Sequence, residues 1–264
     1  MTDSDSQDRV AFSFNGTTLY DSDIQTLAEE EWLGDAIIML LFSLLEEDAH
    51  SADIELWSPA VVQLLSTMDS DNLDPSTSAS LFPPLRKFNI LPISDAYASN
   101  SNTISSHWSL LLIHSPSSSS HLTTYHLDSL DPHNTHAAAR CTANFASAFD
   151  KMPTSIRGVG KKMEAQENAW DCGIYVLSLT QALVHGLMKK EEGGGKEPGG
   201  CVEDIVVGEA TPKKVAQWRS RFYHWVRRWQ AEARRGGGVW NTKEEVVAAL
   251  GPWCPDEDDH QEQS

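Results

Sequence analysis

The sequence has 264 residues, enough for one large domain or two small ones with a substantial core. Its hydrophobic fraction of 40% is typical of a globular protein. With 20 basic and 38 acidic residues, its formal net charge of −18 argues against nucleic acid or an anionic membrane as a partner, because positive charge supplies most of the attraction to either.

Neither a membrane span nor a signal peptide is predicted. No stretch approaches the roughly 20 consecutive apolar residues of a transmembrane helix. Residues 1–9 are polar and acidic, so we expect a disordered N-terminus and a protein of the cytoplasm, the nucleus or both. Because Cys141, Cys172, Cys201 and Cys254 include no CxxC pair, we expect no zinc site and no redox dithiol. In a reducing compartment we expect no disulfide either. We also expect no cofactor and no other metal.

The first third of the chain predicts a hairpin followed by helices. Asn15-Gly16 is typical of a tight turn, here between strands Val10–Phe14 and Thr17–Tyr20. The apolar run Ala36–Leu45 contains no Gly or Pro and predicts a buried helix. Another helix is predicted from Ser58, with Pro59 in its first turn, to about Met68.

The middle of the chain predicts β-structure. Phe88–Ile93 is a short apolar run that contains Pro92, so we expect an edge strand. His107–Ile113 and Leu122–Leu127 are stronger strand patterns, and the Ser- and Pro-rich residues between them indicate a hairpin.

Helices dominate the remainder. We expect a helix over Ala137–Phe149, a short strand over Lys162–Ala165, and a helix from Cys172 to about Leu187. Lys189–Thr211 is charged and rich in Gly, which indicates a flexible insertion. Pro212 then opens a long helix that runs to about Arg235.

The long helix has an aromatic stripe and many arginines. The stripe has helical spacing and predicts core packing; it consists of Trp218, Phe222, Trp225 and Trp229. The arginines are expected on the solvated face of the helix; they are Arg219, Arg221, Arg227, Arg228, Arg234 and Arg235.

Cys172 is the strongest candidate for a catalytic group. A lone cysteine before an apolar helix is most often a small buried hydrophobe. At a helix N-terminus, however, the dipole and the unpaired backbone N–H groups favour thiolate over thiol, and the same N–H groups can form half of an oxyanion hole. Gln166 could supply a second donor to the oxyanion, and Gly173 would let a substrate backbone come close.

A base and its orienting group are expected on the predicted hairpin. His107 begins one strand and Asp128 follows the next, and adjacent antiparallel strands can bring such residues together. In that arrangement a carboxylate holds an imidazole in the tautomer that catalysis requires. Asp131 competes for this role, but Asp131-Pro132-His133-Asn134 is more typical of a turn.

Four segments follow one another along the chain: Glu31-Trp32-Leu33-Gly34-Asp35-Ala36-Ile37-Ile38, His107-Trp108-Ser109-Leu110-Leu111, His126-Leu127-Asp128-Ser129, and Gln166-x-Asn168-x-x-Asp171-Cys172-Gly173-x-Tyr175. Together they resemble the ubiquitin-like-protein-specific cysteine proteases, that is, the sentrin-specific (SUMO) proteases and the deneddylases. The resemblance covers roughly Leu19 to Leu187. Any one segment would be weak evidence, whereas four in the family's order are specific.

The resemblance implies a papain-like α+β fold, with an antiparallel sheet between helices and no metal. It implies cleavage after the C-terminal diglycine of a ubiquitin-like modifier. By position, Cys172 would be the nucleophile, His107 the general base and then acid, Asp128 the orienting residue and Gln166 the oxyanion donor. We expect a monomer whose partners are the modifier and its conjugates.

The resemblance also implies substrate contacts. Trp32 and Trp108 would roof a narrow tunnel for the diglycine, Asp35 would contact the modifier, and Gly173 would lie beside the substrate. The chain departs from the family where Gly34 replaces the usual Asn, and a local hydrogen bond could be lost there. Leu127 and Trp170 also depart, by replacing an aromatic residue and a smaller or phenolic one respectively.

The expected domain organisation combines this resemblance with the composition of the chain. We expect a catalytic core over residues 10–188, the insertion over 189–211, a C-terminal helical part of the same domain over 212–253, and an acidic tail over 254–264.

Two segments resemble the deneddylase branch: Ile90–Ile93 and Thr211–Lys214. We therefore expect a deneddylase, with a SUMO protease as the first alternative. Another alternative is an inactive module that only binds a modifier. An acetyltransferase with the same triad would need a basic pocket for its cofactor, and the sequence offers none.

Overall fold

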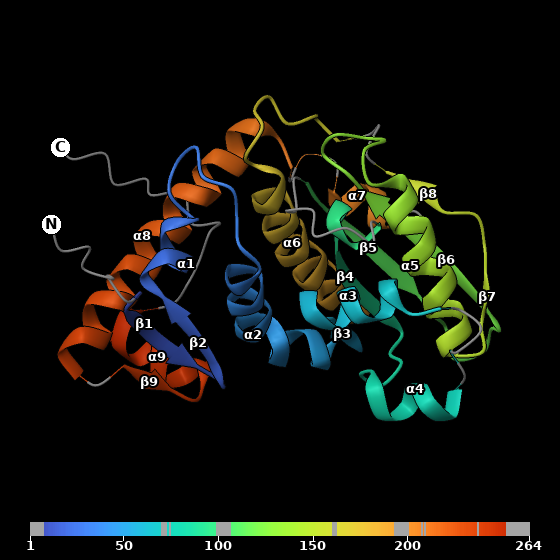
Figure 1. Ribbon diagram of the computed structural model, residues 1–264, viewed down its shortest axis with the longest axis horizontal. Coiled ribbons are helices and arrows are strands. Elements are labelled where there is room, and N and C mark those ends of the chain that lie inside the picture. The colour runs from blue at the N-terminus through green and yellow to red at the C-terminus, as the bar shows by residue number, and fades with distance from the viewer. Residues whose placement is uncertain are drawn as a thin grey trace, which may run out of the picture.

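A computed structural model describes residues 8–69, 73, 75–98, 107–159, 163–192, 201–206, 208, 210–236 and 238–251 (Figure 1). Its strands are β1 (Val10–Phe14), β2 (Thr17–Tyr20), β3 (Ile54–Leu56), β4 (Phe88–Ser94), β5 (Trp108–His114), β6 (His121–Leu127), β7 (Met152–Pro153), β8 (Arg157–Gly158) and β9 (Val239–Trp240). Its helices are α1 (Asp21–Gln25), α2 (Asp35–Ser51), α3 (Pro59–Thr67), α4 (Pro75–Leu81), the 3₁₀ helix η2 (Asp95–Ala98), α5 (Thr135–Ala148), α6 (Cys172–Glu192), α7 (Cys201–Val206), α8 (Pro212–Gly236) and α9 (Lys243–Leu250).

The larger of two sheets has the strand order β3-β4-β5-β6-β7, and β8 also pairs with β6. β5 pairs antiparallel with both of its neighbours, β4 and β6, whereas β3, β7 and β8 are short parallel additions. A smaller sheet, in the order β2-β1-β9, lies beside α8 and α9 at the other end of the molecule (Figure 1). The predicted α+β class is therefore confirmed.

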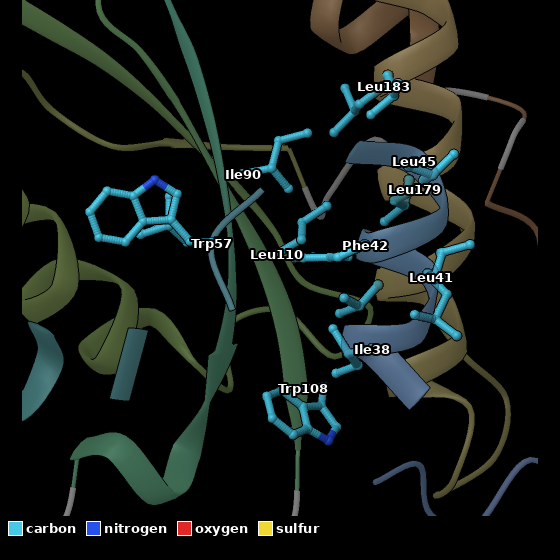
Figure 2. Packing of buried hydrophobic residues seen from close by; sticks show 14 of the residues in the cluster. Ile38, Leu41, Phe42, Leu45, Trp57, Ile90, Trp108, Leu110, Leu179 and Leu183 are labelled. Carbon is cyan, nitrogen blue, oxygen red and sulfur yellow. The ribbon is translucent and has the colours of Figure 1, made fainter. Parts of the chain in front are cut away.

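Helices cover both faces of the large sheet. Side chains of α2 and α6 gather on the face where Ile90 and Leu110 point, while Trp57 lies on the opposite face (Figure 2). Trp57 is fully buried and packs on Phe145 of α5, with ring centroids 5.3 Å apart. In the described residues, no helix combines the length and the apolar character that a bilayer crossing requires.

Local sequence signals produced the expected local structure. Asn15 and Gly16 have φ angles of 45° and 79° and join β1 to β2, as the Asn-Gly turn predicted. Ser58 caps α3, because its side chain accepts a hydrogen bond from the N–H of Val61 at 3.3 Å. The β5–β6 hairpin is also confirmed.

The prediction that Phe88–Ile93 is an edge strand is wrong. β4 lies between β3 and β5, but β3 pairs only with residues 88–90 of β4. Pro92 lies beyond the end of β3 and pairs with Leu110 of β5. The proline is tolerated because β4 has a partner strand on only one side at that position.

Two other segments differ from the prediction. Residues 163–165 form no strand, and the short strands that pair with β6 come earlier, as β7 and β8. The predicted insertion over 189–211 is helical at its start, where α6 continues to Glu192, and again in α7, where Val202 and Val206 are buried. Residues 193–200, 1–7 and 252–264 lie outside the described residues, so most of the predicted N-terminal and acidic tails do too.

The aromatic stripe of α8 is buried, as predicted. Trp229 is fully buried and stacks on Phe12 of β1, with ring centroids 4.4 Å apart, and it also contacts Phe14 and Trp240. This stripe joins the small sheet to α8. The expectation that all six arginines are solvated is wrong for Arg219, which is 5% exposed.

We expect Trp229→Ala to lower the free energy of unfolding by about 3–5 kcal/mol, because it removes the ring that β1, β9 and α8 share. Chemical denaturation monitored by circular dichroism measures this loss. Val239→Ala, at a side chain that is 65% exposed in β9, is the control and should change stability by less than about 0.5 kcal/mol. Equal effects of the two substitutions would contradict the shared core.

Candidate active site

Cys172 is the first residue of α6, and the loop before it is shaped by Asn168. The side-chain oxygen of Asn168 accepts hydrogen bonds from the N–H groups of Trp170 at 3.1 Å and Asp171 at 2.9 Å. These bonds turn the chain into the helix and place Cys172 at its positive end. The Cys172 side chain is largely covered, with 6% of the residue exposed.

His107 and Asp128 meet at the end of the β5–β6 hairpin. Nε2 of His107 lies 2.6 Å from Oδ1 of Asp128, and both side chains are 1% exposed. Leu110 pairs with Leu127, so continuing this register sets Asp128 opposite Ser109, diagonal to His107. The structure therefore brings the predicted base and the predicted orienting carboxylate together.

The surroundings of Asp128 keep it ionised. Burial alone would raise the pKa of its carboxyl group, but hydrogen bonds from His107 and from the backbone N–H groups of Asn134 and Leu130 outweigh burial and lower it. Both backbone bonds measure 2.9 Å. The alternative candidate, Asp131, makes no such bond to His107 and belongs to the turn before α5.

The environment of His107 favours its protonated form. Burial opposes the positive charge, but hydrogen bonds to Asp128 and Cys172, together with their negative charges, raise the pKa of the imidazole to about 9. Nδ1 is buried and has no hydrogen-bond partner of ordinary geometry among the described residues, so it is the ring atom left for the thiol. A loose contact of this kind is common in free enzymes and tightens when substrate binds.

Gln166 is held so that its amide group has one donor to spare. Its Oε1 accepts a hydrogen bond from the Ser129 hydroxyl at 2.7 Å, and its Nε2 donates to the Asn168 carbonyl at 2.7 Å. Nε2 carries two hydrogens, so the second remains available to another acceptor. Since Gln166 is 7% exposed, this donor would act in a site from which water is largely excluded.

Three of the predicted substrate contacts lie on the segment that leads into α2, in the first turn of α2 and at the start of β5. Trp32 is 48% exposed, whereas Trp108 is buried and donates from its indole N–H to the carbonyl of Leu33 at 3.1 Å. Asp35 is exposed in the first turn of α2. Trp32 and Asp35 are thus accessible to a partner, and Trp108 fastens the segment between them.

The structure gives Gly173 a neighbour that the sequence did not predict. A Cβ at this position would lie 2.6 Å from the Cβ of Leu33, closer than side chains approach one another. The space that we expected Gly173 to leave for substrate is therefore filled by Leu33. The absent side chain lets the segment that carries Trp32 pack on the first turn of α6.

Two residues of the site were missed from the sequence. Asn134 is buried, and its amide nitrogen donates to the carbonyl of His107 at 3.2 Å and to the Ser109 hydroxyl at 3.1 Å. Arg219 reaches the loop before Cys172 by pairing with Asp171. Their roles depend on contacts with residues distant in sequence, which local patterns do not indicate. One signal was present for Arg219: it lies four residues after Val215 and therefore on the same, buried face of the helix.

No group of His, Cys, Asp and Glu side chains suited to a metal ion occurs among the residues that the structure describes. The side chains of the site are a thiol, an imidazole, a carboxylate and an amide donor, which are the components of nucleophilic acyl transfer.

Comparisons with known proteins show which family the chain resembles. Residues 100–193 match the model of the Ulp1 protease family, C-terminal catalytic domain. The mouse protein called sentrin-specific protease 8 is 30% identical over 191 residues, which cover 70% of this chain and 82% of the relative. The Dictyostelium discoideum protein called probable sentrin-specific protease 8 is 26% identical over 216 residues, which cover 77% of this chain and 87% of the relative.

A solved structure shares the fold. It is the C-terminal Ulp1 protease domain in complex with Smt3, the yeast ortholog of SUMO, with a TM-score of 0.54 and 18% identity over 84% of this chain and 89% of that chain. The papain-like fold expected from the sequence is the fold of this domain. The chain thus belongs to the Ulp1 protease family, and the predicted cysteine peptidase is confirmed.

Proposed function

We propose that this cysteine peptidase cleaves after the C-terminal diglycine of a ubiquitin-like modifier, releasing it from lysine side chains, from a precursor, or from both. The observation that carries the proposal is the buried His107, whose Nε2 is 2.6 Å from Asp128 while its other ring nitrogen is left for Cys172. A nucleophile, a base and an orienting group within reach of one another are the signature of covalent acyl transfer.

The proposed reaction has two stages. The Cys172 thiolate attacks the carbonyl carbon of the terminal glycine, and Gln166 and the Cys172 backbone N–H stabilise the resulting oxyanion. His107 gives its proton to the departing lysine amine as the C–N bond breaks, which leaves a thioester on Cys172. His107 then takes a proton from water, whose oxygen attacks the thioester, and the modifier leaves with a free carboxylate.

We assign modifier binding to the segment before α2 and its neighbour on β5. Trp32, which is half exposed, and Trp108 would border the diglycine, and Asp35 would contact the body of the modifier. Gly173 acts here through Leu33, because the close packing of these two residues sets the position of Trp32. A net charge of −18 favours a modifier with a basic face.

The neddylation modifier is the proposed substrate, and SUMO is the alternative. The segments Ile90–Ile93 and Thr211–Lys214, which resemble the deneddylase branch, support the first choice. The relatives named sentrin-specific protease support a ubiquitin-like protein as the class of substrate. We propose action in the cytoplasm or the nucleus, which suits the unpaired cysteines Cys141 and Cys172.

Ubiquitin, SUMO and the neddylation modifier, each carrying a C-terminal electrophile, test the function directly. We expect a covalent adduct with the neddylation-modifier probe, seen as a mass increase, and none with Cys172→Ala. Cys141→Ala is the control, because Cys141 is fully buried within α5, and it should react like the wild type. An adduct with SUMO alone would reverse the choice of modifier, and no adduct from folded protein would favour a binding module without activity.

The pKa of His107 predicts the alkaline limit of activity. Because this pKa is raised to about 9, the imidazole keeps the proton needed by the leaving amine below that pH, and kcat/KM should fall as the pH rises through about 9. Asp128→Asn removes the hydrogen bond and the negative charge that raise this pKa. The alkaline limb should then move by about 1–3 pH units toward lower pH, and kcat should fall.

Asp131→Asn is the matched control for this experiment, because it makes the same substitution three residues later in a side chain not bonded to His107. We expect its pH profile to coincide with that of the wild type. If Asp131→Asn moved the alkaline limb and Asp128→Asn did not, the assignment of the orienting residue would be wrong.

Gln166→Ala tests the oxyanion donor. We expect kcat to fall by about 10²- to 10³-fold, as for the loss of one oxyanion-hole donor elsewhere, with little change in modifier affinity. Steady-state cleavage of a fluorogenic modifier substrate and titration of the Cys172→Ala background with intact modifier measure the two effects. A large loss of affinity at unchanged kcat would instead make Gln166 a binding residue.

A further inference from the structure

A buried guanidinium lies behind the loop that carries Cys172. Arg219 of α8 has a side chain that is 6% exposed. All three of its nitrogens donate hydrogen bonds: Nε to Asp171 Oδ1 at 2.9 Å, Nη2 to the Trp170 carbonyl at 3.0 Å, and Nη1 to the carbonyls of Ala28 at 2.6 Å and Glu31 at 3.1 Å. One side chain therefore joins α8 to two separate segments of the active site.

The polar surroundings offset only part of the cost of burying this charge, because the pKa of the guanidinium stays below its usual value. Burial lowers the pKa of the guanidinium, whereas the negative charges of Asp171 and Cys172 oppose that effect. Because arginine presents its donors in a rigid planar fork, it fixes the relative positions of the oxygens it binds. A lysine at the same place would keep the charge but could not span all of these acceptors.

From Arg219, hydrogen bonds continue to the proposed oxyanion donor. The second carboxylate oxygen of Asp171 accepts from the side-chain amide of Asn168 at 2.8 Å. The backbone carbonyl of Asn168 accepts from Nε2 of Gln166 at 2.7 Å. The bond between Asp171 and Asn168 therefore links the guanidinium to the residue that orients the Gln166 amide.

The other arm of Arg219 holds the segment proposed to bind the modifier. The carbonyls of Ala28 and Glu31 belong to the stretch just before Trp32. That stretch and the cysteine loop also touch directly, through Leu33 and Gly173. A displacement of the guanidinium would thus move the substrate-contacting segment relative to the nucleophile.

We propose that Arg219 and Asp171 are positioning residues that set the Gln166 amide and the Trp32 segment against Cys172. Asp171 acts through Asn168 on the orientation of the Gln166 amide. The guanidinium of Arg219 also holds the segment before Trp32 and thereby affects modifier binding. The inference rests on the proposed function, because it concerns the same acyl transfer. It assigns α8 a part in catalysis although none of its residues is proposed to touch the substrate.

Asp171→Asn tests the oxyanion arm. An amide at position 171 can still accept from Arg219, but it then presents an NH₂ group to the NH₂ group of Asn168, so that link is lost. We expect kcat for a fluorogenic modifier substrate to fall on the order of 10- to 100-fold with KM unchanged. Alkylation of Cys172 by iodoacetamide should keep its rate, because this displacement forms no oxyanion.

Exchanging the two side chains provides a rescue. Asn168→Asp alone places a second carboxylate beside that of Asp171, and their repulsion should also lower kcat. This variant serves as the test if Asp171→Asn does not fold. In the double variant Asp171→Asn with Asn168→Asp, the carboxylate at 168 can accept from the amide at 171, and its other oxygen can still accept the backbone N–H groups of the loop. We expect kcat of the double variant to exceed that of either single variant by about tenfold.

Arg219→Lys tests the second arm. We expect both a lower kcat and a KM raised by about three- to tenfold, because the carbonyls near Trp32 lose their donor. Arg234→Lys is the matched control on the same helix, since Arg234 pairs with Asp21 at a side chain that is 46% exposed. It should leave kcat and KM unchanged.

With an active wild type, two results would overturn the positioning role. One is an unchanged kcat in both Asp171→Asn and Asn168→Asp. The other is a double variant whose kcat does not exceed that of either single variant. A wild type that reacts with no modifier probe would instead refute the proposed function itself. Loss of iodoacetamide reactivity together with kcat in Asp171→Asn would also count against the proposal, because it would show a general collapse of the site.

Discussion

The hydrogen bond between His107 and Asp128 is the interaction on which the rest of the site depends. Neither ionised group would be stable alone at this depth, because burial disfavours both charges. Each charge stabilises the other. The backbone N–H groups of Leu130, in the turn before α5, and of Asn134, its N-cap, complete the coordination of the carboxylate. The antiparallel register of β5 and β6 therefore determines the catalytic pair directly. A shift of one residue in this register would turn either His107 or Asp128 to the opposite face of the sheet.

The nucleophile comes from a different layer of the fold, so its position must be set separately. Cys172 begins α6, which packs with α2 on one face of the sheet, whereas Asn134 is at the start of α5 on the other face (Figure 1). Reaction requires these layers to keep their relative position to within a fraction of an ångström. The bonds that Asn168 makes within its own loop fix the turn into α6, but not the position of that turn against the rest of the site.

Much of the fold could be predicted because its signals are local. The Asn15-Gly16 turn, the Ser58 cap and the β5–β6 hairpin each depend on residues close in sequence, and each was expected. The position of β4 and the burial of Arg219 depend on distant partners and were predicted wrongly. Cys172, His107, Asp128 and Gln166 were candidates from their places before a helix and on a hairpin, and the resemblance then gave each a role. The close packing of Leu33 on Gly173 became visible only in three dimensions.

The segment that carries Trp32 shows how local and distant contacts substitute for one another. Gly34 caps α2 without a side-chain hydrogen bond, at the position where the family usually has Asn, so the helix start lacks that local anchor. The local bonds of this segment include one from the Gly34 N–H to the Thr26 hydroxyl at 3.2 Å and one from the Glu31 N–H to the Ala28 carbonyl at 3.3 Å. Distant anchors come from β5, through Trp108, and from α8, through Arg219, which binds the Glu31 carbonyl from 188 residues away. Because the segment that carries Trp32 is held mainly by tertiary contacts, its position depends on β5 and α8. The loop before Cys172 binds the same arginine, so the positions of the segment and the loop are coupled.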